Sequence, residues 1–274
     1  MNKKNIFIGF LLLFFIVGFK PVVNKEDVFS QATQIRSFLP RENSKPLVLE
    51  LSSLPEKEKF VYKAKFLGLS IGTFIIMNNG KRELNGKEVY CFELTVKTPA
   101  FFSLLFKPKD RYVSYMDAKD LVVIRHEEYI KKGELIESAV DFDYKDLTAT
   151  YKNFINLKES TVKIPTKLLD GLSGIFYIRM MPLELGDTVD LNIYADQIIY
   201  NYVGLVSSKT KVTLPIYGKK DAYHFKPYLF LEGKQVKKIS AEAFFSGSIP
   251  SKVLRATLKT ILGKVNVILV EGYE

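Results

Sequence analysis

The sequence FVYKAKFLGLSIGTFIIM, residues 60–77, has the pattern that best indicates the fold class. From Phe60 to Phe66 an aromatic residue or an alanine occupies every second position. A short segment with a glycine at each end interrupts this alternation, and a second apolar run then continues to Met77. Because successive side chains of a β-strand point to opposite faces, a period of two residues indicates a strand with one buried face. The stretch therefore predicts two strands joined by a tight connection.

The same period of two continues along the chain, with turn sequences between the runs. Asn78-Asn79-Gly80 and Leu84-Asn85-Gly86 are turn signals, because asparagine and glycine tolerate the backbone angles of tight hairpins. Turns recur about every 8–12 residues, which is typical of an antiparallel all-β fold. The predicted strands are Glu88–Val96, Tyr112–Met116, Val122–Tyr129, Leu135–Phe142, Thr148–Phe154, Val189–Tyr194, Ile198–Val206, Lys211–Leu214, Tyr223–Leu231 and Ser240–Phe245, with two more at the C-terminus.

The segment Leu168–Met181 has the periodicity of a helix instead. Thr166 is placed to cap its start, and Pro182 stops it. Its wide apolar face consists of Leu168, Leu169, Leu172, Ile175, Phe176 and Met180. We expect this helix to cover part of the inner face of the sheet. If it leaves a groove, Leu172, Ile175 and Phe176 are candidate contacts for a hydrophobic ligand.

The segment of residues 100–106, between Pro99 and Pro108, is strongly apolar and lacks a strand-like period. It is also too short for an independent helix. It either plugs the open end of the sheet or forms a mobile lid or a membrane-touching tip. Its candidate ligand-binding residues are Phe101, Phe102, Leu105 and Phe106.

These elements predict a mainly β protein. We expect one large, curved antiparallel sheet, a half-open barrel, with the 168–181 helix packed on its concave side and short extra helices elsewhere. One such short helix is predicted from Lys25 to Phe38. The chain divides into a leader (residues 1–20), a helix and linker (21–56) and a β domain (57–274).

The N-terminus carries a targeting signal. Lys3 and Lys4 precede an unbroken apolar run of 14 residues, Ile6 to Phe19. The run is short for a hydrocarbon core of about 30 Å, but it has the length of a signal-peptide core. No clean cleavage site follows it. We therefore expect a signal peptide or an uncleaved anchor, and in both cases an exported protein of the periplasm or cell envelope.

Charge and cysteine content narrow the choice of partners. The 40 Lys and Arg residues exceed the 30 Asp and Glu residues, so the formal net charge is +10. The basic stripe with interleaved aromatic residues that nucleic-acid binding needs is missing, so we expect no nucleic-acid partner. Weak attraction to anionic membrane surfaces is a more natural consequence, and a solvated, soluble surface is the favoured interpretation of the charge. Cys91 is the only cysteine, so no internal disulfide forms, and its strand-like surroundings predict a buried apolar role.

The sequence offers little for catalysis. It contains no phosphate-binding loop, nucleophile elbow or zinc-binding helix motif. His126 and Glu128 would share one strand face, but a metal site would need further ligands. Asp141 and Asp143 share a face too, without the glycine and spacing of a calcium loop, and are expected in solvent. We therefore predict no enzymatic activity, no metal and no cofactor.

The polar residues of the predicted helix have a separate meaning. Asp170 and Ser173 are three residues apart and face one way. Asp170 and Arg179 lie on opposite sides of the helix and cannot pair with each other. We expect these groups to tie the helix to the sheet, with a role in ligand binding as the alternative.

Several short motifs follow one another in a fixed order over about residues 58–250. The central motif is DGLSGIFYIR, residues 170–179, followed by Gly186-Asp187. The other motifs are Phe60-Val61-Tyr62, Gly68-Leu69-Ser70-Ile71-Gly72, Ser114-Tyr115-Met116-Asp117 and Asp141-Phe142-Asp143. The ordered set resembles the bacterial exported family called domain of unknown function 3108, although this chain has Lys65-Phe66 where many members have tryptophan.

The resemblance implies an exported envelope protein built on a large antiparallel sheet. It implies no reaction, because the family has no established catalytic residues. The structural motif residues that we assign within the matching motifs are Gly68, Gly72, Asp170, Ser173, Arg179 and Asp187.

Two functions fit these observations. The first is binding of a lipid or another hydrophobic molecule at the cell envelope, by analogy with other envelope carriers at the level of the fold. The second is a structural or interaction protein that holds an envelope partner through an exposed sheet edge. A large continuous cavity would favour the first function, and a filled core with a long bare edge would favour the second.

Overall fold

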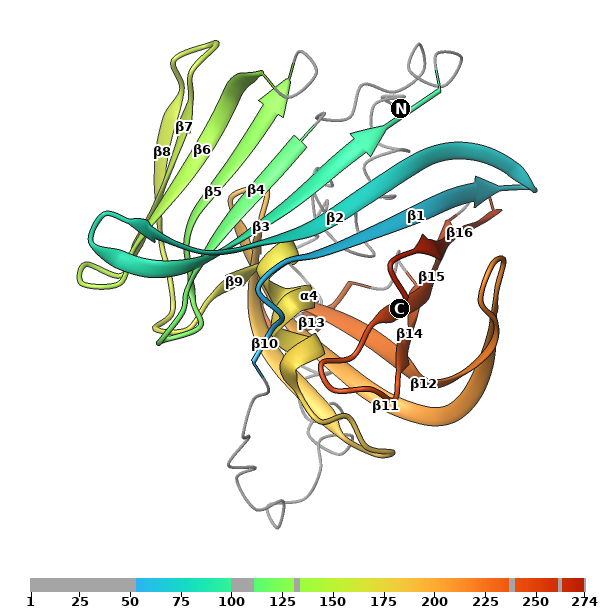
Figure 1. Ribbon diagram of the computed structural model, residues 1–274. Helices are drawn as coiled ribbons and strands as arrows, with labels where there is room; N and C mark the ends of the chain where they lie inside the picture. Colours follow the sequence, from blue (N-terminus) through green and yellow to red (C-terminus); the bar gives the residue numbers. More distant parts are fainter. Residues whose placement is uncertain (1–52, 100–110, 131–133, 237–239, 261–262, 274) are drawn as a thin grey trace.

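Strands make up most of the molecule. The computed structural model describes residues 53–99, 111–130, 134–236, 240–260 and 263–273, and one 16-stranded sheet runs through them (Figure 1). Its strands are β1 (Glu58–Phe66), β2 (Leu69–Leu84), β3 (Lys87–Lys97), β4 (Arg111–Asp117), β5 (Val123–Ile130), β6 (Leu135–Asp143), β7 (Thr148–Asn153), β8 (Glu159–Lys163), β9 (Leu169–Asp170), β10 (Thr188–Ala195), β11 (Ile198–Leu214), β12 (Gly218–Leu231), β13 (Lys234–Gln235), β14 (Ser240–Ser246), β15 (Val253–Thr260) and β16 (Gly263–Glu271). The predicted mainly β fold is confirmed.

The strand order shows two halves that meet in the centre of the sheet. From β1 the chain runs outward as a meander to β8, and on the other side β16 pairs with β1 and leads outward through β15, β14, β12 and β11 to β10. Neighbouring strands are antiparallel, except that the short β9 is parallel to β10. Figure 1 shows both halves curving around one helix, α4. Within the described residues the sheet is not closed, as expected for a half-open barrel.

The antiparallel order gathers the connections at two opposite edges of the curved sheet. The β1–β2, β7–β8, β10–β11 and β12–β13 connections lie at one edge, which we call the first rim. The β2–β3, β4–β5, β6–β7 and β11–β12 connections lie at the other edge, the second rim. Turns that are far apart in the sequence therefore share a rim.

Two hairpin turns use one backbone geometry with different residues. The β1–β2 turn has Leu67 at φ 48° and Gly68 at φ 83°, and the β2–β3 turn has Asn85 at φ 52° and Gly86 at φ 76°. Positive φ at both central positions suits the right-handed twist of the flanking strands. Asparagine and glycine adopt this conformation readily, whereas leucine rarely does.

The helix α4 (Gly171–Met180) lies on the concave side of the sheet, where it packs against β3 and β4 of one half and β10 of the other (Figure 1). The prediction placed its start too early: Leu169–Asp170 pairs with β10 as β9, and Asp170, instead of Thr166, caps the helix. In the described part of the chain no helix is both long enough and apolar enough to span a membrane.

Two hydrophobic clusters fill the described structure. The main cluster lies between α4 and the inner faces of both halves, and it includes Phe92, Phe176 and Phe225, which are fully buried. A second cluster joins β5–β8 to β10, with the ring of Phe142 at 5.0 Å from that of Tyr194, edge to face. The two outer regions of the sheet order therefore pack against each other across the fold.

Three strand predictions need correction. β2 continues through Asn78-Asn79-Gly80 as a bulge instead of turning, because the Asn78 side chain donates to the Pro55 carbonyl oxygen at 2.7 Å and accepts from the Gly80 N–H at 3.0 Å. The two predicted strands within 198–214 are one bulged strand, β11, and β8 was not predicted. The predicted 25–38 helix and the 100–106 segment lie outside the described residues.

Candidate functional site

A buried polar network ties the start of α4 to the sheet. The Asp170 side chain accepts hydrogen bonds from the Ser173 N–H and the Ser173 hydroxyl, both at 2.7 Å, and the Ser173 oxygen accepts from the Asp170 N–H at 2.9 Å. This reciprocal arrangement is a capping box, which satisfies donors that a helix start leaves unpaired. The second Asp170 oxygen is 2.8 Å from His126 Nδ1 on β5. This buried contact thus joins the start of α4 to β5, 44 residues earlier in the sequence.

Electrostatics favour the charged form of both partners. Burial alone would lower the pKa of His126, but the hydrogen bond and charge of Asp170 and the charges of Glu128 and Glu127 outweigh it, so the pKa is raised. Burial alone would raise the pKa of Asp170, yet the hydrogen bonds from His126 and Ser173 hold it below its ordinary value. Both shifts favour the ion-paired form of this buried contact.

Serine, histidine and aspartate occur here together, but not in the arrangement of a nucleophilic triad. In a triad the serine hydroxyl bonds to the histidine, which activates it. Here the Ser173 hydroxyl bonds to Asp170, and His126 Nε2 lies 3.9 Å from a Glu128 oxygen. Within the described residues no three His, Cys, Asp or Glu side chains are grouped to hold a metal ion. The geometry supports anchoring of the helix.

A second buried contact holds the end of α4. Arg179 is 2% exposed, donates from Nη2 to a Glu58 oxygen at 2.8 Å and from Nε to the Ser251 carbonyl oxygen at 2.6 Å. Its guanidinium lies over the rings of Phe60, at 4.6 Å, and Phe176, at 5.0 Å. As predicted, Arg179 and Asp170 do not pair. Each end of α4 instead has its own partner on the sheet or its loops.

The other motif residues have local roles. Gly68 occupies the β1–β2 turn, and Gly72 lies where a Cβ atom would be 3.4 Å from the Lys97 carbonyl oxygen. Asp187 accepts from the Glu184 N–H at 2.7 Å and so shapes the loop before β10. The predicted structural motif is thus spread over the fold and forms no single site.

The predicted ligand-binding residues fall into two groups. Leu172 and Phe176 are fully buried, with the Phe176 ring stacked at 3.9 Å on Phe92, while Ile175 is half-buried. A ligand would reach Leu172 and Phe176 only if α4 moved. The remaining predicted ligand-binding residues, Phe101, Phe102, Leu105 and Phe106, lie outside the described residues.

Sequence reasoning missed a second apolar surface on the concave side. At the first-rim end of β11, β12 and β14, side chains that share the face of the buried Phe225 are only half-buried. We call this surface the mouth, and it consists of Ile198, Tyr202, Leu229, Leu231 and Ala241. The alternation of apolar and polar residues along each strand was visible in the sequence. The position at which α4 stops covering the inner face of the sheet was not.

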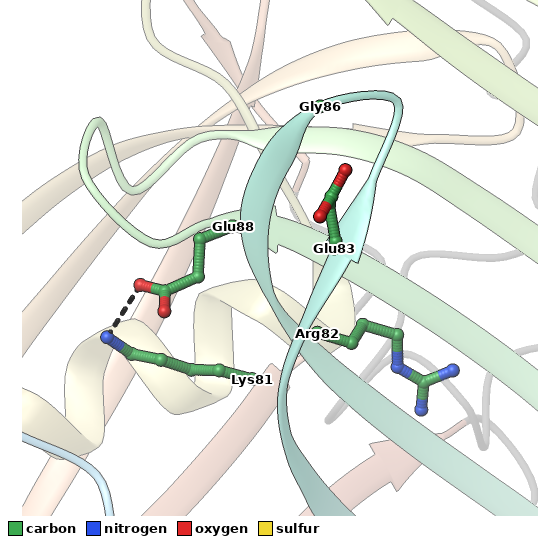
Figure 2. Close-up of a pocket in the computed structure, with 5 residues that line it drawn as sticks. All are labelled: Lys81, Arg82, Glu83, Gly86 and Glu88. Atoms are coloured by element: carbon green, nitrogen blue, oxygen red, sulfur yellow. Dashed lines mark hydrogen bonds and ion pairs between the residues drawn. The ribbon is translucent and has the colours of Figure 1, made fainter.

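An open hollow of about 320 Å³ lies at the β2–β3 hairpin (Figure 2). Its lining residues are Lys81, Arg82, Glu83, Gly86 and Glu88. All are exposed, and Lys81 pairs with Glu88 at 2.9 Å, as the dashed line in Figure 2 shows. Exposed pairs of this kind contribute little free energy, so we treat the hollow as part of the solvated surface.

Comparison with known proteins identifies the family. Residues 61–271 match the family described as "Protein of unknown function (DUF3108)", and the chain belongs to this family, as its motifs indicated. No curated protein matches the chain.

Three solved structures are similar to the chain at low sequence identity. A β-barrel-like protein from Brucella abortus, described as domain of unknown function DUF1849, has a TM-score of 0.48 and 9% identity and covers 82% of this chain and 100% of its own. A proposed exported protein with a YmcC-like fold from Bacteroides fragilis has a TM-score of 0.33 and 8% identity, covering 80% and 96%. A proposed lipoprotein from Parabacteroides distasonis has a TM-score of 0.35 and 9% identity, covering 80% and 95%.

Proposed function

We propose that this chain works outside the cytoplasm, at the cell envelope, as a non-catalytic protein that binds a lipid or another hydrophobic molecule. Support for export comes from the sequence, where Lys3 and Lys4 precede the apolar run Ile6–Phe19. Support for a hydrophobic ligand comes from the mouth, whose apolar side chains are incompletely covered by the described residues.

The mouth is the observation that carries this proposal. Burying a large apolar side chain fully contributes about 1.5–3 kcal/mol, so half-buried residues leave part of this free energy to a ligand. The fully buried ring of Phe225 lies beneath the mouth. It packs directly against the backbone of Gly204, where a Cβ atom would be 1.9 Å from the ring. Tyr202 stacks near Phe225, with ring centroids 6.4 Å apart. An acyl chain has the chemistry to cover such an apolar surface.

The surface beneath α4 suits the same ligand less well. Leu172 and Phe176 already fill that space, and the Asp170 and Arg179 contacts fix the helix at both ends. A ligand beneath the helix would have to break two buried ion pairs. We therefore place the ligand at the mouth, beside the helix.

Titration of a fluorescent fatty-acid probe tests the proposal. Leu229→Gln changes the mouth, and Tyr228→Gln changes the opposite face of the same strand at the neighbouring position. We expect saturable binding by the wild-type protein, weakened about tenfold by Leu229→Gln and unchanged by Tyr228→Gln. Equal binding by all three proteins would contradict the assignment of the mouth.

The proposed location has its own test. A reporter fused after residue 40 should be active only outside the cytoplasm. A reporter that is active only in the cytoplasm would refute the proposal of export.

The alternative function is an envelope protein that binds a protein partner through a sheet edge. β8 favours it, because β8 ends the strand order and, within the described residues, pairs only with β7. Its exposed Glu159 and Lys163 argue against this function, because charges of this kind commonly protect edges against pairing. A wild-type protein without saturable probe binding would put this alternative first.

A further inference from the structure

Two leucines at the first rim combine an unusual backbone conformation with high exposure. Leu67 in the β1–β2 turn has φ 48° and is 78% exposed, and Leu157 in the β7–β8 loop has φ 56° and is 86% exposed. A left-handed backbone is unfavourable for leucine, and exposure of its apolar side chain to water is unfavourable as well. Neither the turn nor the core explains a leucine at these positions.

Other turns of the same molecule show what the fold itself requires. The β2–β3 turn has the same geometry with Asn85, a residue that tolerates it. Leu121 and Leu147, at the second rim, also have positive φ, but both pack against a hydrophobic cluster. Among the described residues, Leu67 and Leu157 are thus the leucines with positive φ whose side chains remain in water.

The neighbours of these leucines extend the apolar character of the two tips. Leu69 is 64% exposed beside the β1–β2 turn, and Phe154 and Ile155 are exposed in the β7–β8 loop. That loop is held by the Asn153 side chain, which accepts from the N–H groups of Ile155 and Asn156 at 3.0 and 2.9 Å. Two separate tips along the first rim of the sheet therefore present apolar side chains.

Positive charge surrounds the β1–β2 tip. Lys65 is exposed on β1 beside the turn, Lys97 is exposed on β3 opposite Thr73 of β2, and Lys264 is exposed at the start of β16, which pairs with β1. Ion pairs between these three lysines and carboxylates are absent from the described part of the chain. Lys158 is likewise exposed next to Leu157. At the β7–β8 tip Lys158 is followed by the exposed Glu159, so the excess positive charge lies at the β1–β2 tip. An apolar tip with such lysines complements an anionic lipid surface, whose headgroups attract the lysines while its acyl region accepts the leucines.

We propose that the first rim docks on an anionic membrane surface, with Leu67, Leu69 and Leu157 inserted at the headgroup boundary. This inference rests on the proposed function for its location, and it deepens that function because the mouth opens at the same rim. Docking would bring the mouth to the source of its hydrophobic ligand.

Vesicle flotation tests the inference with the full chain. Leu67→Asn and Leu157→Asn restore the residue type that the backbone prefers, so both variants should fold, which a denaturation curve checks. Ile216→Asn is the matched control, because Ile216 is 71% exposed in a turn at the second rim. We expect wild-type protein to float with phosphatidylglycerol vesicles more than with phosphatidylcholine vesicles. Each rim variant should lower the apparent affinity about tenfold, and Ile216→Asn should leave it unchanged.

The outcomes separate the possible partners and the two proposals. Equal flotation of Leu67→Asn, Leu157→Asn and wild type would overturn the inference, as would an equal loss in Ile216→Asn. A rim variant that changed the oligomeric state in solution, without a change in flotation, would assign the tips to a second copy of the chain and also overturn it. Probe binding measured without vesicles should be normal in the rim variants, so loss of probe binding in Leu229→Gln tests the mouth separately.

Discussion

The helix α4 and the first rim both place side chains against their usual preference, in opposite directions. The charged side chains of Asp170, which caps α4, and Arg179, near its end, are buried in the core. The side chains of Leu67 and Leu157 at the rim are exposed to water. Each charged group of the helix meets a partner inside the molecule, so structure is enough to explain it. The rim leucines have no such contact in the described structure. A buried charge with a partner inside the molecule therefore indicates a role in stability. An exposed leucine without such a contact indicates a role in binding an external surface.

Breaking the pair at the end of α4 should have the largest effect on stability. Arg179→Met would leave the largely buried Glu58 carboxylate without its cation, and such losses cost about 3–5 kcal/mol. Denaturant unfolding measures the change. Adding Glu58→Gln should recover part of the lost stability, and no recovery would mean that the packing of Arg179 on Phe60 and Phe176 dominates.

Removal of the carboxylate at the start of α4 should have a smaller effect. Asp170→Ala leaves Ser173 and His126 without a shared partner, and we expect a loss of about 1–3 kcal/mol. The denaturation midpoint should fall accordingly. An unchanged midpoint would show that this network contributes nothing, and the contrast with the rim would disappear.

The same pair should make stability depend on pH. The raised pKa of His126 means that its contribution is complete below the unfolded value near 6.5 and is lost as the pH rises through the folded value. The lowered pKa of Asp170 means that its contribution is present above the unfolded value near 3.9 and is lost as the pH falls through the folded value. The contribution of the pair is therefore greatest between these values. Asp170→Asn should flatten the decline above pH 6.5, and an identical decline in the variant would exclude the pair as its cause.

The smallest effect on stability is expected at the rim. Leu67→Asn removes no core contact and relieves an unfavourable backbone conformation, so unfolding free energy should change by no more than about 0.5 kcal/mol or rise slightly. Thermal denaturation beside Leu121→Asn is the sharpest comparison, because Leu121 packs against the core and its replacement should destabilise. A large loss of unfolding free energy in Leu67→Asn would show that Leu67 contributes to stability, and the contrast with α4 would no longer hold.

Features encoded locally could be predicted from the sequence. The alternation from Phe60 to Phe66 and the turn at Asn85-Gly86 each depend on residues close together in the chain, and the structure confirms them. Of the predicted apolar helix face, the structure confirms Leu172, Phe176 and Met180 as buried residues of α4, whereas Leu168 and Leu169 precede the helix. The capping box was visible only as the spacing of Asp170 and Ser173.

Features that depend on distant contacts could not be predicted. The pairing of His126 with Asp170 requires the sheet to bring β5 to the start of α4, and no local pattern specifies this. The shared rim of Leu67 and Leu157 follows from the strand order, and the mouth follows from where α4 stops covering the sheet. Each needs the complete topology.

Native mass spectrometry of the protein purified from the cell envelope would detect a ligand bound at the mouth. We expect a wild-type species heavier than the polypeptide by the mass of a lipid or another hydrophobic molecule. This species should be depleted in Leu229→Gln and retained in Tyr228→Gln. A wild-type spectrum with the polypeptide mass alone, or an adduct equally abundant in both variants, would contradict binding at the mouth.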